Sequence, residues 1–238
     1  MKAIILPTIS TSDLAPLTSW SPESLLPVVN KPVVEHLIEL LARHQFKEIL
    51  LILKHMPYET EAYFGDGSRW GVHLSYSLLG NYRGISDALG HLDASKLEEP
   101  FLCLPADLIT DLNITEFVKF YQQGEGGACL AIEAGSGPGQ EKLQQAVTEG
   151  LSEMDLCPLI MTGETFKSLT KIIDPVVNPT VPDKPGRELD SVKTYQAPFS
   201  CQRIKSLADL VTANRRVLEG DFKNILIPGK HTQSRTED

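Results

Sequence analysis

Short apolar runs alternate with amphipathic segments through most of this chain, and this alternation constrains the fold more than any other feature. Residues 3–6 (AIIL) and 48–53 (EILLIL) have the length of strands, and residues 33–44 between them place apolar side chains on one face of a helix. The pattern then predicts further strands at 72–79, 101–108 and 127–134, and helices at 58–64, 86–94 and 114–123. Strands that are each followed by a helix pair in parallel, so the sequence predicts an α/β fold, a Rossmann-like three-layer sandwich with a mostly parallel central sheet.

The second half of the chain is less regular. Residues 135–155 are polar and rich in glycine at first, which indicates an excursion from the sheet, and the following apolar run (CPLIM) predicts a strand that leads into a helix. Four prolines among residues 174–189 exclude a central strand there, and a last helix is expected from Ser206 to Gly220. We therefore expect a single domain over residues 1–228 and a polar, disordered tail over 229–238.

Composition excludes several classes of function. The formal net charge is −9 and there is no cluster of Lys or Arg, so binding to the phosphates of nucleic acid has little electrostatic support. No apolar run approaches the roughly 18 residues that span a membrane, and the N-terminal run is too short for a secretion signal, so we expect a cytoplasmic protein. Cys103 and Cys129 lie in apolar runs and are expected to be buried thiols, with zinc or redox chemistry as the remote alternative.

A parallel sheet of this kind binds ligands beyond the carboxyl ends of its strands. The loops after residues 6, 53, 79, 104 and 132 should therefore form any site. Asp107, just past the expected strand FLCLP, is the carboxylate best placed to bind a divalent metal. A solvated loop aspartate, or a helix cap, is the alternative interpretation of Asp107.

Six segments of the sequence together resemble the sugar-1-phosphate nucleotidyltransferase family. They are MKAIIL, LAPLT, LLPVVNKPVVEHLIELL, YFGDGSRWGVHLSYS, FLCLPADLITDLNITEFVKFY and ADLVTANRRVLEGDFKN, in the order and spacing of the family. The resemblance implies the nucleotide-diphospho-sugar transferase type of fold. It also implies an enzyme that joins a nucleoside triphosphate to a sugar phosphate, releases pyrophosphate and uses Mg²⁺.

The first loop departs from that family. Its members have a glycine-rich loop and an arginine that contact the triphosphate, and a lysine after the next proline. In this chain the glycine positions are Ile9 and Thr11, the arginine position is Asp13, and the lysine position is Glu23. Reversing a charge about 4 Å from a phosphate replaces an attraction of about 4 kcal/mol by a comparable repulsion, so the resemblance implies weakened nucleotide binding.

The positions that would contact the base and the metal also differ. The segment that packs on the base corresponds to residues 84–89, where Gly84 is kept but Asp87 replaces a usual glycine. Of the two aspartates that hold Mg²⁺ in the family, Asp107 matches the first, whereas Arg203 stands at the second. A guanidinium cannot bind a metal, so we expect Arg203 to form an ion pair with Asp107 in place of the ion.

Three functions follow from these departures. The first is a catalytically degenerate protein without a cofactor, which acts by binding or regulation as a homo-oligomer or as the partner of an active relative. The second is an active sugar-1-phosphate nucleotidyltransferase that uses Mg²⁺ and binds a nucleotide and a sugar phosphate. The third is a sensor of a sugar phosphate or a divalent cation at Asp13, Glu23, Asp87 and Asp107, although these acids could also be solvated loop residues.

Two tryptophans bear on the choice between these functions. Trp20 in TSWSP and Trp70 in GSRWG would favour partner binding if their rings are exposed. The alternative is that Trp20 covers the core beneath the first loop and that Trp70 packs within a structural turn.

Overall fold

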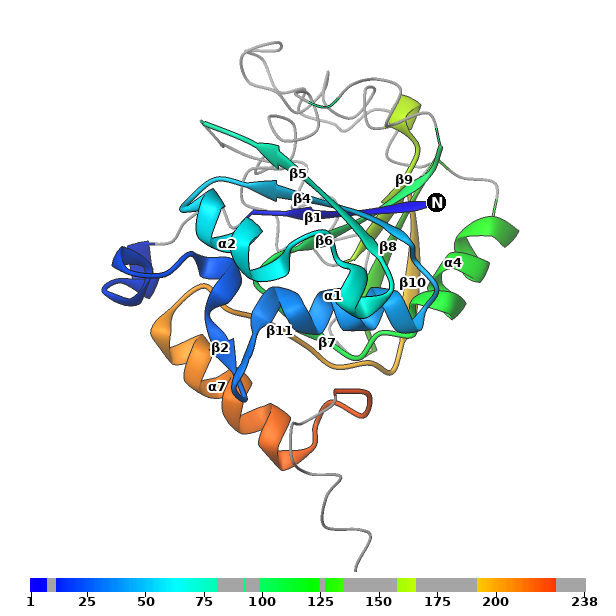
Figure 1. Ribbon diagram of the computed structural model, residues 1–238. Coiled ribbons are helices and arrows are strands. Elements are labelled where there is room, and N and C mark those ends of the chain that lie inside the picture. The colour runs from blue at the N-terminus through cyan, green and yellow to red at the C-terminus, as the bar shows by residue number, and fades with distance from the viewer. Residues whose placement is uncertain are drawn as a thin grey trace, which may run out of the picture.

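The computed structural model describes residues 1–7, 12–80, 92, 99–124, 127–134, 158–165 and 192–225. Within these ranges it shows one large sheet with the strand order β10-β8-β9-β6-β1-β4-β5 (Figure 1). The strands are β1 (Lys2–Leu6), β4 (Glu48–Leu53), β5 (His73–Leu78), β6 (Phe101–Pro105), β8 (Ala128–Glu133), β9 (Leu159–Met161) and β10 (Val192–Ala197). The α/β fold expected from the sequence is confirmed.

The centre of the sheet is parallel. Strand β1 lies between β4 and β6 and runs parallel to both, β5 continues parallel to β4, and β10 is parallel to β8. Strand β9 is the exception, because it is antiparallel to both of its neighbours, β6 and β8. The strand expected in CPLIM is therefore present, but neither its direction nor strand β10 follows from the sequence pattern.

Helices α1 (Val33–Arg43) and α2 (Pro57–Phe64) lie on one face of the sheet (Figure 1). The apolar face of α1 is buried against the strands. Helix α4 (Ile114–Gln123) is capped by Asn113, whose side chain accepts a hydrogen bond from the Glu116 N–H. These three helices match the predicted ones, whereas the helix expected over residues 86–94 lies outside the described residues.

Helix α7 (Leu207–Glu219) closes the domain. Ser206 and Asp209 form a capping box at its start, and Gly220, in the left-handed region at φ 89°, ends it. The predicted bounds of this helix are confirmed. Cys103 and Cys129 are buried free thiols, as expected.

The run FLCLPADL does not form one strand, contrary to the sequence-based expectation. Strand β6 ends at Pro105, and the chain turns through Ala106 and Asp107 into β7 (Leu108–Thr110), which pairs antiparallel with β11 (Cys201–Arg203). Two backbone hydrogen bonds fix this turn, from Ala106 N–H to the Leu6 carbonyl and from Ile204 N–H to the Asp107 carbonyl. The break places Asp107 at the carboxyl end of β6, directly beside β11.

Residues 27–32 form a small hairpin, β2 (Pro27–Val28) and β3 (Lys31–Pro32), that the sequence did not predict. Its two turn residues, Val29 and Asn30, both have positive φ, at 51° and 61°. The hairpin leads directly from the loop after β1 into helix α1, so it helps to position that loop.

Candidate functional site: a strand edge closed by an arginine

Asp107 is buried at the carboxyl end of β6. Its residue is only 3% exposed, so the alternative of a solvated loop aspartate is wrong, and Asn113 rather than Asp107 caps the following helix. A carboxylate this far from water needs a compensating positive charge or several hydrogen bonds.

Arg203 at the end of β11 supplies that compensation. Its Nε donates to Asp107 Oδ1 at 2.5 Å and its Nη2 donates to Asp107 Oδ2 at 2.9 Å, so the two planar groups meet in a bidentate pair. The Arg203 side chain is itself 18% exposed. The ion pair expected from the sequence is therefore present.

This arrangement does not fit a magnesium ion at Asp107. Mg²⁺ requires oxygen ligands in near-octahedral geometry, and here both carboxylate oxygens already accept hydrogen bonds from a guanidinium that stays protonated. Among the described residues, no group of three or more His, Cys, Asp or Glu side chains could hold a metal ion. In this arrangement Asp107 is not positioned as a ligand for Mg²⁺.

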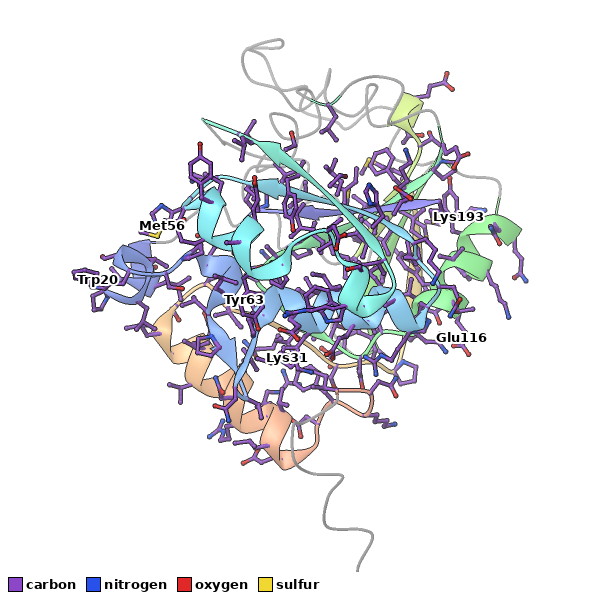
Figure 2. The ribbon with its side chains drawn as sticks, viewed as in Figure 1. Trp20, Lys31, Met56, Tyr63, Glu116 and Lys193 are labelled. Carbon is purple, nitrogen blue, oxygen red and sulfur yellow. The ribbon has the colours of Figure 1, made fainter. Side chains whose placement is uncertain are left out.

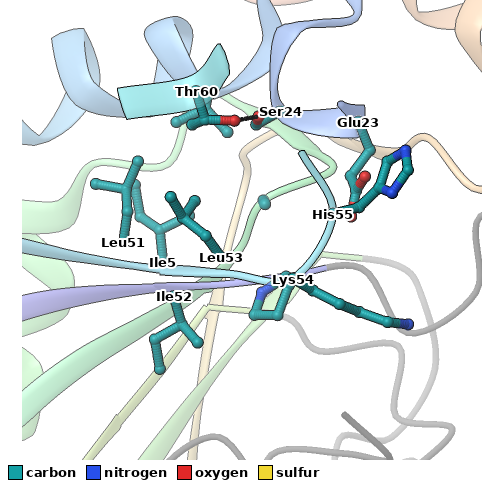
Figure 3. A pocket seen from close by; sticks show the side chains of 12 residues that line it. Ile5, Glu23, Ser24, Leu51, Ile52, Leu53, Lys54, His55 and Thr60 are labelled. Atoms are coloured by element: carbon teal, nitrogen blue, oxygen red, sulfur yellow. Dashed lines mark hydrogen bonds between the residues drawn. The ribbon is translucent and has the colours of Figure 1, made fainter. Parts of the chain in front are cut away.

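Glu23 lies in the pocket at the carboxyl ends of β1 and β4, within the short 3-10 helix η3 (Glu23–Leu25). The pocket is a small cavity of about 20 Å³, lined mainly by apolar residues such as Ile5, Leu51 and Leu53 (Figure 3). Glu23 is only 6% exposed, and its Oε2 has no hydrogen-bond partner among the described residues. Within the described part of the chain, this carboxyl oxygen thus has no donor to compensate its burial.

The protonation of Glu23 reflects this environment. Burial raises the pKa of the Glu23 carboxyl above its ordinary value, and the negative charge of Asp107 adds to this effect. A backbone hydrogen bond and the positive charges of His55 and Lys54 oppose the increase in pKa without cancelling it. Glu23 is therefore not the solvated loop acid that the sequence left open as an alternative.

The other predicted site residues are less informative. Asp13 is exposed in the 3-10 turn η1 (Ser12–Leu14). Thr11, Gly84 and Asp87 lie outside the described residues, so their placement in the same pocket stays a prediction.

Four pocket residues were missed by the sequence reasoning. Lys54 and His55 follow strand β4 directly, and the His55 Nε2 lies 2.8 Å from the Thr18 carbonyl oxygen. The Ser24 and Thr60 hydroxyls share a buried hydrogen bond of 2.7 Å, and Figure 3 shows this pair at one side of the pocket. The position of Lys54 and His55 after an apolar strand was the signal that could have identified them.

The two tryptophans differ. Trp20 is 87% exposed and projects outward from the edge of the molecule (Figure 2), so the expectation that it covers the core is wrong. Trp70 packs against the core, with the Arg69 guanidinium 3.7 Å from its ring centroid and Phe64 beside it. Trp70 is therefore a structural residue, whereas Trp20 has the exposure that partner binding requires.

A largely parallel sheet with a pocket at its carboxyl edge defines a doubly wound α/β domain. The sequence profile of the Nucleotidyl transferase family matches residues 2–137, more than half of the chain. The chain therefore belongs to the nucleotidyl transferase family.

Curated relatives agree with this assignment. The chain is 30% identical over 264 aligned residues to a UTP–glucose-1-phosphate uridylyltransferase of Synechocystis sp., covering 96% of this chain and 66% of the relative. It is 33% identical to the low-salt glycan biosynthesis nucleotidyltransferase Agl11 of Haloferax volcanii, over 59% of this chain and 40% of that protein. A third relative, translation initiation factor eIF2B subunit epsilon of Dictyostelium discoideum, is 26% identical over 51% of this chain and 18% of its own length. The chain thus spans two thirds or less of each of these relatives.

Solved structures support the fold. A Bacillus anthracis protein provisionally assigned as a glucose-1-phosphate thymidylyltransferase superposes with a TM-score of 0.72 at 20% identity, covering 90% of this chain and 94% of its own. A UDP-glucose pyrophosphorylase complexed with UDP-glucose gives 0.65 at 16% identity, covering 92% and 99%. Across the described part of the chain, no helix is long and apolar enough to cross a membrane.

Proposed function

We propose that this chain is a cytoplasmic, nucleotidyltransferase-like protein that acts through binding or regulation, as a homo-oligomer or as the partner of an active relative, and that it does not transfer nucleotides. Catalysis in this family requires positive charge around a triphosphate, as the resemblance implies. The proposal therefore concerns the charges at the pocket.

The observation that carries this proposal is Glu23. It stands where the family has a lysine, and its side chain is buried in the pocket at the ends of β1 and β4. The substitution removes a cation and leaves a carboxyl group that lacks a donor among the described residues. A triphosphate brought to this pocket would lose an attraction and, with Glu23 ionised, meet a repulsion.

One of the relatives is consistent with a binding role. The Dictyostelium relative is named as a subunit of a translation initiation factor and not for a nucleotidyl transfer reaction. The exposed ring of Trp20, three residues before Glu23, offers an aromatic contact for a partner.

A second candidate function is an active sugar-1-phosphate nucleotidyltransferase. The observation that favours it is the presence of Lys54 and His55 in the same pocket as Glu23, because these residues could supply positive charge from the loop after β4. The Synechocystis relative, named for uridylyl transfer to glucose 1-phosphate, also supports this alternative.

The test is a calorimetric titration of the purified chain with UTP, dTTP, GTP and ATP in the presence of MgCl₂, beside a pyrophosphate-release assay with sugar 1-phosphates. We expect neither binding nor release from the wild-type chain. Glu23→Lys restores the cation, and Glu23→Gln removes the acid without adding one. Binding gained by Glu23→Lys alone would show that the lost cation limits affinity.

Pyrophosphate release by the wild-type chain would overturn the proposal. Lys54→Ala then tests the second candidate function, because loss of turnover in that variant would identify Lys54 as the source of the positive charge. Wild-type turnover that survives Lys54→Ala would refute this source of charge too.

A further inference from the structure

We infer that the Arg203 guanidinium takes the place of a divalent cation at Asp107, so that the chain neutralises this carboxylate itself and recruits no metal there. The inference rests on the proposed function, in which Asp107 stands at a metal-ligand position of the family that no longer binds a metal. It adds the reason why no metal binds, which is the guanidinium of a single residue, Arg203.

The geometry of the ion pair between Arg203 and Asp107 supports replacement of the metal ion by the guanidinium. Two parallel N–H groups of Arg203 face two oxygens of Asp107, at 2.5 and 2.9 Å, which is the fork geometry of the strongest ion pairs. Ninety-six residues separate the two in sequence, so the contact depends on the tertiary fold.

The backbone holds both residues in place. Arg203 is in register with Leu108, the residue after Asp107, in the antiparallel pair of β7 and β11. The Ile204 N–H donates to the Asp107 carbonyl at 2.9 Å, one residue beyond the guanidinium. The side-chain pair is thus continuous with a backbone ladder, and the guanidinium cannot withdraw from the carboxylate without leaving a buried charge.

Burial explains why some cation is required. With Asp107 only 3% exposed, its ionised form would be strongly disfavoured without a positive partner. In a metal site the ion provides this charge, whereas here the Arg203 guanidinium provides it. A divalent ion could bind only by displacing the guanidinium, which would then repel it.

The inference predicts that substitution of Arg203 opens the site to a cation. Arg203→Asp offers a second carboxylate beside Asp107, and Arg203→Asn offers a neutral oxygen if the doubly acidic variant folds poorly. Arg215→Asp, on the exposed side of α7, is the matched control because it changes the net charge by the same amount. Asp107→Asn combined with Arg203→Asp removes the original ligand.

The measurements are the thermal midpoint with and without about 10 mM MgCl₂, and binding of Mn²⁺ followed by electron paramagnetic resonance, which does not require high stability. At that concentration, a site of about 1 mM affinity raises the midpoint of a domain of this size by roughly 3–6 °C. We expect this rise, and Mn²⁺ bound in a 1:1 ratio, for Arg203→Asp, with a smaller rise for Arg203→Asn. The wild type and Arg215→Asp should show neither effect, and the double variant should show no more than Arg203→Asn.

Two results would overturn the inference. One is a wild-type chain that binds Mn²⁺ and loses the ion in Asp107→Asn, since the guanidinium would then not replace the metal. The other is that neither Arg203 variant binds more Mn²⁺ than Arg215→Asp. Both results are independent of nucleotide binding and pyrophosphate release, so they are distinguishable from a failure of the proposed function.

Discussion

The side chain of Asn214 on α7 accepts a hydrogen bond from the backbone N–H of Val29, 185 residues earlier, at 2.8 Å. The Asn214 amide also donates to the Pro27 and Leu210 carbonyls, at 3.3 and 2.8 Å. Val29 is a β-branched residue at φ 51°, a conformation that β-branched residues rarely adopt. One amide therefore joins the last helix to the hairpin that leads into α1, and it helps to hold a strained turn.

Replacement of Asn214 should consequently be costly. Asn214→Ala leaves the Val29 N–H and two carbonyls without a partner, and we expect a loss of about 2–3 kcal/mol in the free energy of unfolding. Asn214→Asp keeps the acceptor for Val29 but loses the amide donor, so its loss should be smaller. Urea denaturation measures both values, and an Asn214→Ala loss below that of Asn214→Asp would contradict this role.

The raised pKa of Glu23 predicts a pH dependence of stability. The unfolded chain ionises Glu23 near its ordinary value of 4.5, whereas burial holds the folded-state pKa higher. Below pH 4.5 both states are protonated, so burial of Glu23 carries no electrostatic penalty. As the pH rises from 4.5 through the folded-state pKa, the folded state is progressively destabilised relative to the unfolded state.

Glu23→Gln cannot ionise and should lack this decline. The difference in unfolding free energy between variant and wild type should therefore move in favour of the variant as the pH rises from 4 to about 8. Glu59→Gln, an exposed acid on α2, is the control. A difference for Glu23→Gln that stays constant with pH would show that the Glu23 carboxyl is not perturbed by burial.

Much of the fold could be predicted because its central strands carry their own signal. Strands β1, β4 and β6 are continuous apolar runs, helix α1 between β1 and β4 has a clear apolar face, and the later helices α4 and α7 have the caps Asn113 and Ser206. Strand β10 (VKTYQA) lies at an edge of the sheet and mixes polar and apolar residues without strict alternation after a proline-rich stretch, so it gave no comparable signal. The antiparallel direction of β9 depends on pairing between distant segments, which no local pattern specifies.

The site was predictable only in part. The contact between Arg203 and Asp107 could be predicted because the two residues align with the two metal-binding aspartates of the family. A buried carboxylate that has lost its metal needs another positive charge. The raised pKa of Glu23 did not follow from the sequence. It depends on the burial of Glu23 and on His55 and Lys54, which tertiary packing brings to Glu23 from the loop after β4. Sequence identified which charges changed, whereas the structure was needed to determine which of them water can reach.

The two tryptophans differ in burial, so their replacement by alanine should affect the free energy of unfolding to different extents. Trp20→Ala should change the unfolding free energy by no more than about 0.5 kcal/mol, because its ring makes little contact with the protein. Trp70→Ala removes a ring packed on Phe64 and stacked by Arg69, and should cost about 2 kcal/mol. Fluorescence provides a second measurement, since Trp20→Ala should shift the emission to shorter wavelength and Trp70→Ala to longer. A destabilised Trp20→Ala would show that the ring supports the loop and is not available for a partner.

The ion pair at the strand edge should contribute strongly to stability only as a pair. Arg203→Ala leaves the Asp107 carboxylate buried without its counter-charge, and we expect a loss of about 3 kcal/mol, at the lower end for buried pairs because the Arg203 side chain is partly exposed. Arg203→Lys keeps the charge but loses the bidentate fork, so its loss should be intermediate. Asp107→Leu combined with Arg203→Met replaces both charges by apolar groups and should recover most of the loss. Urea denaturation of the set, with Arg215→Ala as the exposed control, measures these differences, and an Arg203→Ala loss no larger than the control would mean that the pair contributes little to the fold.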